Sequence, residues 1–299
     1  MKSLRFAAID IGSNAVRLLI TSVSPGDPDE RQHKLHKIRF PLRLGQESFV
    51  SGKISDDKVK QLVRLMIAFK QLMTAYDVNA YRACATAALR NAVNAHEIIA
   101  EIKNEAELDI EVIDGQEESF ITYRSHFGEN TEKEKNQVLV DVGGGSTEIS
   151  LIVGGALIQS KSYDIGTIRL LTGMVKGTDW DQLHEDLKAL RNTYPVPDLI
   201  ASGGNIIKLN AMVPARKGHR LPLTSLETLY DTLRQQSTAE LIERYALKPD
   251  RADVITHAAH IYIDVAKSLG VEHFLVPGKR LIDGIIQILW SNWKAENGK

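Results

Sequence analysis

The chain has 299 residues, of which 43% are hydrophobic and 25% charged, and its formal net charge is −1. These values are typical of a globular protein with one large domain or two ordinary ones, and they argue against a disordered chain or a general nucleic-acid binder. No apolar run is long enough to cross a bilayer, and Asp10 interrupts the segment where a signal peptide would be apolar. The sequence therefore predicts a cytoplasmic protein without a membrane partner.

The first part of the chain is predicted to form a hairpin followed by alternating extended and helical segments. A strand over 4–9, a glycine turn and the apolar residues 16–23 indicate the hairpin, and residues 24–30 form a turn-rich connection to extended chain over 34–44. Ser55 is typical of an N-cap, and apolar residues recur at helical spacing over 59–73. A second helix over 94–106, a short strand over 110–114 and a helix opening after Gly115 follow. Cys84, the single cysteine, lies among small residues, which favours a buried and inert thiol.

The second part begins after a polar, charged segment at 128–137, where we place the domain boundary. A strand, a second glycine turn and two apolar runs around Gly154–Gly155 predict another hairpin. Helices are expected over 180–193, 225–236, 237–245 and 252–269, a strand over 198–202 enters a third glycine turn, and 281–297 forms a closing helix. The predicted domains are 1–125 and 126–299, with the closing helix able to pack back on the first.

Two glycine turns are copies of one pattern. Overlaying "FAAIDIGSNAVRLLI" on "VLVDVGGGSTEISLI" places Asp10 on Asp141, Gly12 on Gly143 and Arg17 on Glu148. Neither turn has the lysine of a P-loop, and strand-like residues follow where a dinucleotide-binding fold needs a helix. Backbone N–H groups at such a hairpin tip can bind an anion, and the aspartate can hold hydrated Mg²⁺ or orient water. One copy alone would be an ordinary tight turn, whereas two copies and the later "ASGG" favour phosphate binding.

Five motifs in order carry a resemblance to a known family: "AIDIGSNAVRLLI", "ATAALRNAVN", "VIDGQEESFITYR", "LVDVGGGSTEIS" and "IASGGNI". They resemble those of the exopolyphosphatase and guanosine pentaphosphate phosphohydrolase family. The resemblance implies an α/β fold of two ribonuclease-H-like, actin-like ATPase domains that face each other across a cleft. It implies an exopolyphosphatase, which releases terminal orthophosphate from inorganic polyphosphate by Mg²⁺-assisted attack of water. Guanosine pentaphosphate is the alternative substrate, with the same chemistry.

The resemblance also assigns roles to residues. Glu118, which closes the "GQEE" motif, is the expected general base, and Glu148 and Arg90 are further catalytic candidates. Asp10, Asp141 and Glu148 are the expected Mg²⁺ ligands. The expected phosphate-binding residues lie in the three glycine turns: Gly12, Ser13, Asn14, Arg17, Gly143, Gly144, Gly145, Ser146, Thr147, Gly203, Gly204 and Asn205.

Other interpretations stay open at this point. A sugar or acyl kinase of the same superfamily would need an acceptor pocket and an adenosine site, and the sequence offers no convincing version of either. A non-catalytic sensor of polyphosphate or guanosine alarmones is compatible with the same motifs. His257 and His260 suit packed or surface positions better than a metal site with Asp264, and the basic stretch Arg216–Arg220 suits a solvated loop slightly better than a polyanion track. The resemblance further implies a short, two-domain form without a helical extension, and a possible homodimer.

Overall fold

The computed structural model describes residues 3–24, 32–127, 136–194, 198–213 and 219–297 of the chain. The chain forms two compact units, residues 1–114 with 281–299 and residues 115–280. The first unit ends at Asp114, before the helix that the sequence analysis assigned to the first domain, and the closing helix belongs to this unit. The polar segment at 128–135, on which the expected boundary rested, lies outside the described residues.

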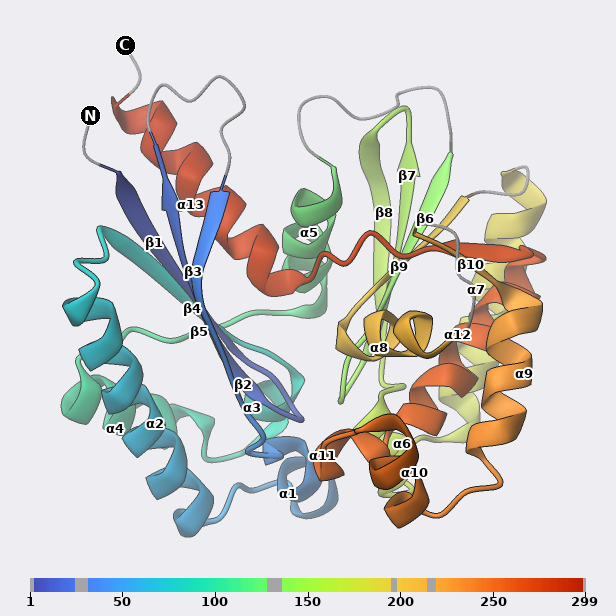
Figure 1. The fold of residues 1–299 in the computed structure, drawn as a ribbon, viewed down its shortest axis with the longest axis horizontal. Coiled ribbons are helices and arrows are strands. Elements are labelled where there is room, and N and C mark those ends of the chain that lie inside the picture. Colours follow the sequence, from blue (N-terminus) through green and yellow to red (C-terminus); the bar gives the residue numbers. More distant parts are fainter. Residues whose placement is uncertain (1–2, 25–31, 128–135, 195–197, 214–218, 298–299) are drawn as a thin grey trace. The chain divides into compact units, whose positions relative to one another are not determined.

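Unit 1 is built on a mixed sheet in the order β3-β2-β1-β4-β5 (Figure 1). β1 pairs antiparallel with β2 and parallel with β4, so a three-strand meander is extended by parallel strands. β1 is buried on both faces, as expected of a central strand. Its elements are β1 (Leu4–Ile11), β2 (Val16–Val23), β3 (Gln32–Phe40), α1 (Leu44–Ser51), α2 (Asp56–Ala75), β4 (Ala80–Ala85), α3 (Ala87–Asn91), α4 (Ala95–Ala106), β5 (Glu111–Val112) and α13 (Leu281–Asn297).

Helices cover the sheet of unit 1 because their apolar residues recur every three or four positions. The buried residues of α2 follow this spacing from Val59 to Met73, and its N-cap is Ser55, as predicted. α2 packs against α4, whereas α13 packs on β1, β2 and β4 on the other side of the sheet (Figure 1). The ring of Trp290 in α13 meets that of Phe6 in β1, with centroids 6.1 Å apart.

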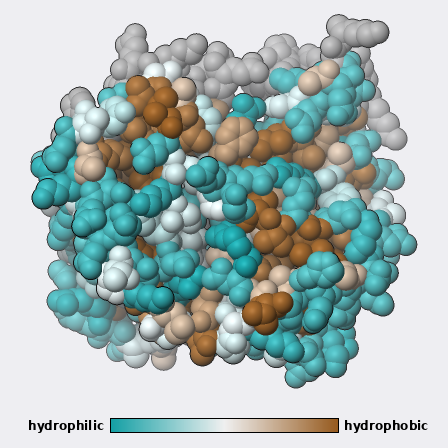
Figure 2. Space-filling view, turned by 180° about the vertical axis from the view of Figure 1, so that it is seen from behind, coloured by the Kyte–Doolittle hydropathy of each residue, from teal (hydrophilic) through white to brown (hydrophobic). Residues whose placement is uncertain are grey.

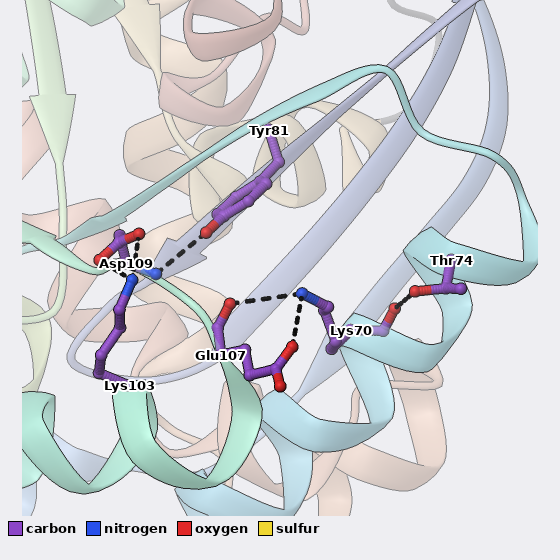
Figure 3. A network of polar contacts seen from close by, with 6 residues as sticks. All are labelled: Lys70, Thr74, Tyr81, Lys103, Glu107 and Asp109. Atoms are coloured by element: carbon purple, nitrogen blue, oxygen red, sulfur yellow. Dashed lines mark hydrogen bonds and ion pairs between the residues drawn. The ribbon is translucent and has the colours of Figure 1, made fainter.

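A surface network ties α2, β4 and α4 together (Figure 3). Lys70 of α2 donates to the carbonyl of Glu107, and Lys103 of α4 lies 2.6 Å from the carboxylate of Asp109. The backbone N–H of Asp109 donates to the hydroxyl of Tyr81 in β4, at 3.0 Å. Exposed ion pairs of this kind contribute about 0–1 kcal/mol each, so burial rather than this network carries the packing.

Unit 2 repeats the design with the sheet order β10-β11-β9-β6-β7-β8. β6 pairs antiparallel with β7 and parallel with β9, and β7 pairs antiparallel with β8. Its elements are α5 (Gly115–His126), β6 (Gln137–Val142), β7 (Thr147–Val153), β8 (Ala156–Tyr163), α6 (Thr167–Leu171), α7 (Gly177–Thr193), β9 (Asp198–Ser202), α8 (Gly204–Met212), β10 (Arg220–Pro222), α9 (Leu223–Leu233), α10 (Thr238–Tyr245), α11 (Pro249–Ala252), α12 (Ile255–Leu269) and β11 (His273–Leu275). α12 is its central helix and contacts α6, α7, α8 and α9.

Most predicted elements are present, and the differences have local reasons. The segment expected to be extended over 34–44 stops at Phe40, and α1 begins at Leu44. β4, α3, α6 and α8 were not predicted, because short segments carry too little periodicity to be distinguished from loops. Gly154 and Gly155 both have positive φ, 63° and 80°, as a two-residue hairpin turn requires. Cys84 is buried, as predicted.

Hydrophobic residues also reach the surface, where Figure 2 shows them in patches among hydrophilic ones. Val93 and Ile158 are examples in units 1 and 2 respectively. A folded chain leaves much apolar surface exposed, because it has too little polar surface to cover the whole molecule. Within the described ranges, no helix combines the length and the hydrophobicity that crossing a membrane requires.

Candidate functional site

The hairpin of β6 and β7 ends in the second glycine turn, which the backbone holds in a fixed orientation. Gly143 N–H donates to the carbonyl of Ser146 and closes the turn at 2.9 Å. The carbonyls of Gly143 and Gly144 accept from backbone N–H groups at the start of α6, and the carbonyl of Gly145 accepts from Nε of Arg169 at 2.7 Å. In a trans peptide the N–H points away from the preceding carbonyl. The N–H groups of residues 144–146 therefore point to the side opposite α6.

Gly166 lies against this turn so closely that no other residue fits. A Cβ on Gly166 would stand 2.5 Å from the carbonyl oxygen of Gly144. Arg169 also pairs with Asp164 at 3.0 Å, so its guanidinium holds the turn and its own loop at once. The turn is thus held with its N–H groups directed outward, the arrangement that an anion site requires, and phosphate binding there stays a prediction.

Two of the predicted carboxylates lie side by side at the base of this hairpin. Asp141 and Glu148 are direct cross-strand partners in β6 and β7, and such partners share one face of the sheet. Burial raises the pKa of the Tyr262 hydroxyl well above its ordinary value, and the charges of Asp141 and Glu148 raise it further. The tyrosine therefore lies within electrostatic reach of both carboxylates.

Glu118 lies on a helix that packs against the same face. A Cβ on Gly115 would stand 2.4 Å from Cβ of Ser162, so the first turn of α5 rests on β8. Ser162 donates to Glu148 at 2.8 Å, and Thr122 of α5 donates to Asp141 at 3.3 Å. Glu118 stands between Gly115 and Thr122 at helical spacing, three and four residues away, and its exposed fraction is 8%. Unit 2 thus brings Glu118, Asp141 and Glu148 together.

The third glycine turn also belongs to this part of unit 2. Gly203 has φ 107°, and a Cβ there would stand 3.0 Å from Oδ1 of Asp141 and 3.2 Å from the Tyr262 hydroxyl. Tyr262 in turn donates to the carbonyl of Ser202. Gly204 and Asn205 begin helix α8, so their role as phosphate ligands stays a prediction.

The first hairpin, in unit 1, has the same backbone design. Gly12 N–H donates to Ala15, and the carbonyls of Ser13 and Asn14 accept from the N–H groups of Gly45 and Arg43 at the start of α1. Gly45 lies as close to the turn as Gly166 does in unit 2: a Cβ there would stand 2.7 Å from Cβ of Ser13.

The side chains of this first hairpin differ from those of the second. Asp10 and Arg17 are cross-strand partners and form an ion pair of 2.5 Å, with Asp10 only 5% exposed. Arg90 lies in α3, which begins beside the turn because Thr86 N–H donates to Ile11, and its Nη1 donates to the carbonyl of Ile113 at 2.7 Å.

The remaining candidates have other contacts. The ring of His260 stands between those of Trp180 and Tyr230, at 5.5 and 6.1 Å, and Asp264 pairs with His184 at 2.7 Å. Among the described residues, no group of three or more histidine, cysteine, aspartate or glutamate side chains could hold a metal ion. Arg220 donates to His273 at 3.1 Å, whereas Arg216 and Lys217 lie outside the described residues.

Sequence reasoning missed the residues that support the turns, namely Gly45, Thr122, Ser162, Gly166, Arg169 and Tyr262. The overlay of the two copies does not reveal them, because it places Gly45 on Lys176 and not on Gly166, so these two glycines correspond only in the structure.

Solved structures with this architecture establish the fold class. A Ppx/GppA family member from Aquifex aeolicus is 25% identical, with a TM-score of 0.77 over the whole of both chains. An exopolyphosphatase from Cytophaga hutchinsonii is 23% identical and shares the fold with a TM-score of 0.83, over 96% of this chain and 98% of that one. The two units are therefore α/β domains with the fold of these proteins, as predicted, and their relation to ribonuclease-H-like and actin-like ATPase domains stays a prediction.

Sequence comparison gives the family. The pattern of the Ppx/GppA phosphatase family matches residues 20–287, and the chain belongs to this family. Exopolyphosphatase 2 of Mycobacterium tuberculosis is 27% identical over 314 aligned residues, which cover 95% of this chain and 98% of that protein. The predicted enzyme class, a phosphatase, is confirmed.

Proposed function

We propose that this chain is an exopolyphosphatase, which releases terminal orthophosphate from inorganic polyphosphate by attack of water. The observation that carries the proposal is the grouping in unit 2 of three carboxylates, Glu118, Asp141 and Glu148. They lie beside a glycine turn in which the N–H groups of residues 144–146 point away from α6. Hydrolysis of a phosphoanhydride needs a carboxylate for the water and positive charge for the phosphoryl oxygens. Family membership and the name of the M. tuberculosis relative support polyphosphate as the substrate.

Asp141 and Glu148 fit a divalent cation. They are adjacent acidic oxygen donors on one sheet face, and hard cations such as Mg²⁺ bind through one or two carboxylates with water and phosphate oxygens completing the shell. We therefore propose Mg²⁺ at this pair, where it would neutralise charge on the phosphate oxygens. Asp10 is already neutralised by Arg17, so its predicted role as a metal ligand has less support than that of the other two.

Glu118 is the proposed general base. Its helix begins at Gly115, so the carboxylate stands in the first turn, where the helix dipole favours an anion able to accept a proton from water. Thr122 and Gly115 of the same helix are fixed to the sheet, which fixes the direction in which Glu118 projects. The N–H groups of residues 144–146 would bind the non-bridging oxygens on which charge develops in the transition state.

Guanosine pentaphosphate remains the alternative substrate, because it presents the same terminal phosphate and the family description joins Ppx with GppA. A cytoplasmic location, a homodimer and the absence of a nucleic-acid partner stay predictions.

Phosphate release from long polyphosphate, short polyphosphate and guanosine pentaphosphate, measured with Mg²⁺, tests the function and ranks the substrates. Glu118→Gln should lower kcat by about 10²–10⁴-fold while substrate binding persists, since only the proton acceptor is lost. Glu117→Gln, the same change one residue away on another side of α5, should keep the wild-type rate within a few fold. Binding of all three substrates without phosphate release would reject the enzyme in favour of a sensor.

A further inference from the structure

A row of three charged side chains crosses the sheet of unit 1 beside its glycine turn. Asp10 of β1 is opposite Arg17 of β2, and Arg17 is opposite Arg39 of β3. Residues directly opposite each other in antiparallel strands project from the same face with Cβ atoms about 4.5–5.5 Å apart. Arg39 therefore stands beside Arg17, on the side away from Asp10.

The same three positions exist in unit 2 with different chemistry. Asp141 of β6 is opposite Glu148 of β7, and Glu148 is opposite Ser162 of β8. There the row is two carboxylates and a hydroxyl that donates to one of them. The two rows occupy the same place in the duplicated fold, so Arg39 is the structural counterpart of a residue that touches a proposed metal ligand.

The face of the unit 1 row can be assigned. Phe6 and Asp10 are four residues apart in β1 and so project from the same face, and Phe6 contacts Trp290 of α13. The row is therefore on the α13 side of the sheet. Its end at Arg39 adjoins the turn, because the next pair along the strands, Val16 and Phe40, leads directly into it.

The row holds two positive groups and one negative group. Arg17 donates through Nη1 to Asp10, whereas its Nε is buried and has no hydrogen-bond partner in the described parts of the chain. Arg17 and Arg39 are directly opposite each other, and like charges in that position of a sheet are destabilising. A phosphate group has several acceptor oxygens and at least one full negative charge, which suits two adjacent guanidinium forks.

We propose that Arg39 is a second phosphate-binding arginine of unit 1, which together with Arg17 binds one phosphate group of the polyphosphate substrate. The inference rests on the proposed function for the identity of the substrate, but the predicted contact is with any phosphoanhydride anion. Arg39 is a binding residue and takes no part in proton transfer.

The first experiment measures pyrophosphate binding to the full chain by calorimetry in EDTA, where turnover does not interfere. Arg39→Gln should weaken binding about tenfold, and Arg39→Lys should restore part of it. The control is Lys37→Gln, which removes one positive charge from the same face of β3 two residues farther from the turn and should change binding less than twofold. Equal effects of Arg39→Gln and Lys37→Gln would overturn the proposal, because binding would then depend on the total positive charge of this face and not on Arg39.

A second readout separates this proposal from the proposed function. In phosphate-release assays, Arg39→Gln should raise KM about tenfold and leave kcat within about threefold. If wild type binds pyrophosphate through Arg39 but hydrolyses no phosphoanhydride, the proposed function fails and the anion site stands. If wild type hydrolyses polyphosphate and Arg39→Gln leaves both KM and pyrophosphate binding unchanged, the function stands and the anion site fails.

Discussion

The hairpin of unit 1 and the hairpin of unit 2 have the same backbone and opposite charge. Each turn has its carbonyls bound by the N–H groups of a following helix, and each has a glycine, Gly45 or Gly166, packed against it. At the base, however, Asp10 faces Arg17, whereas Asp141 faces Glu148. The two units share the backbone of the turn, whereas two of the three positions in each row differ, and we expect these differences to favour an anion in unit 1 and a cation in unit 2.

The comparison also shows why the two aspartates are not equivalent. An aspartate in a 2.5 Å ion pair has its negative charge offset by a guanidinium, and binding Mg²⁺ would mean competing with it. An aspartate next to a glutamate gains from a cation that relieves their mutual repulsion. We therefore expect the second hairpin, rather than the first, to bind Mg²⁺, although the sequence pattern of the two is nearly the same.

The largest expected effect tests this asymmetry directly. Asp141→Asn should lower kcat/KM by about 10²–10³-fold and raise the Mg²⁺ concentration needed for half-maximal rate, because one of two metal ligands loses its charge. Asp10→Asn should cost about tenfold and leave the Mg²⁺ requirement unchanged. Phosphate release titrated with Mg²⁺ decides between them. An equal rise in the Mg²⁺ requirement for both variants would show that the two aspartates contribute equally to metal binding, contrary to the expected difference.

The next effect tests the two supporting glycines. In Gly166→Ala the new methyl would press on the backbone of Gly144 and Gly145, which cannot rotate away, so we expect a loss of about 3 kcal/mol in unfolding free energy. In Gly45→Ala the ring of Phe49 can shift, whereas Cβ of Ser13 moves only with its backbone, so a smaller loss of about 2 kcal/mol is expected.

The control for both glycines is Gly177→Ala, since a Cβ there meets nothing within 4 Å, and it should change stability by less than about 0.5 kcal/mol. Urea unfolding of the three variants measures the loss of unfolding free energy in each and so ranks them. A Gly45→Ala loss as large as that of Gly166→Ala would mean that both turns are equally rigid.

The smallest effect concerns the acidic surroundings of Tyr262. The folded-state pKa of its hydroxyl is raised, mainly by burial and also by Asp141 and Glu148, so the native state keeps a proton that the unfolded chain releases near pH 10. Wild type should therefore lose stability as pH rises above about 10, with this tyrosine contributing at most about 1.4 kcal/mol per pH unit.

Tyr262→Phe should remove that contribution, at a cost of about 1 kcal/mol at neutral pH for the lost bond to the carbonyl of Ser202. The measurement is urea unfolding of both proteins between pH 8 and 11. A stability difference between them that stays constant over this range would show that the pKa of the hydroxyl is not raised in the folded state.

Local sequence was enough to find both hairpins. An apolar run, an aspartate, glycines and a second apolar run are typical of a strand–turn–strand hairpin. The second copy of this pattern supported the prediction, because two chance matches are rarer than one. The helix with Glu118 and the N-cap at Ser55 were equally readable, because capping and helical periodicity are local. The supports were not readable: Thr122, Ser162 and Tyr262 are ordinary polar residues in sequence, and their contacts join segments far apart in the chain.

The sequence by itself determined the family, the pair of glycine turns and the residue types of the site, because these depend on short motifs in fixed order. The tertiary structure alone decided which residues face which. Antiparallel register set Arg17 between Asp10 and Arg39, and Glu148 between Asp141 and Ser162. Register follows from pairing between strands, in which a slip of one residue turns every side chain to the other face, and no window of sequence records that pairing.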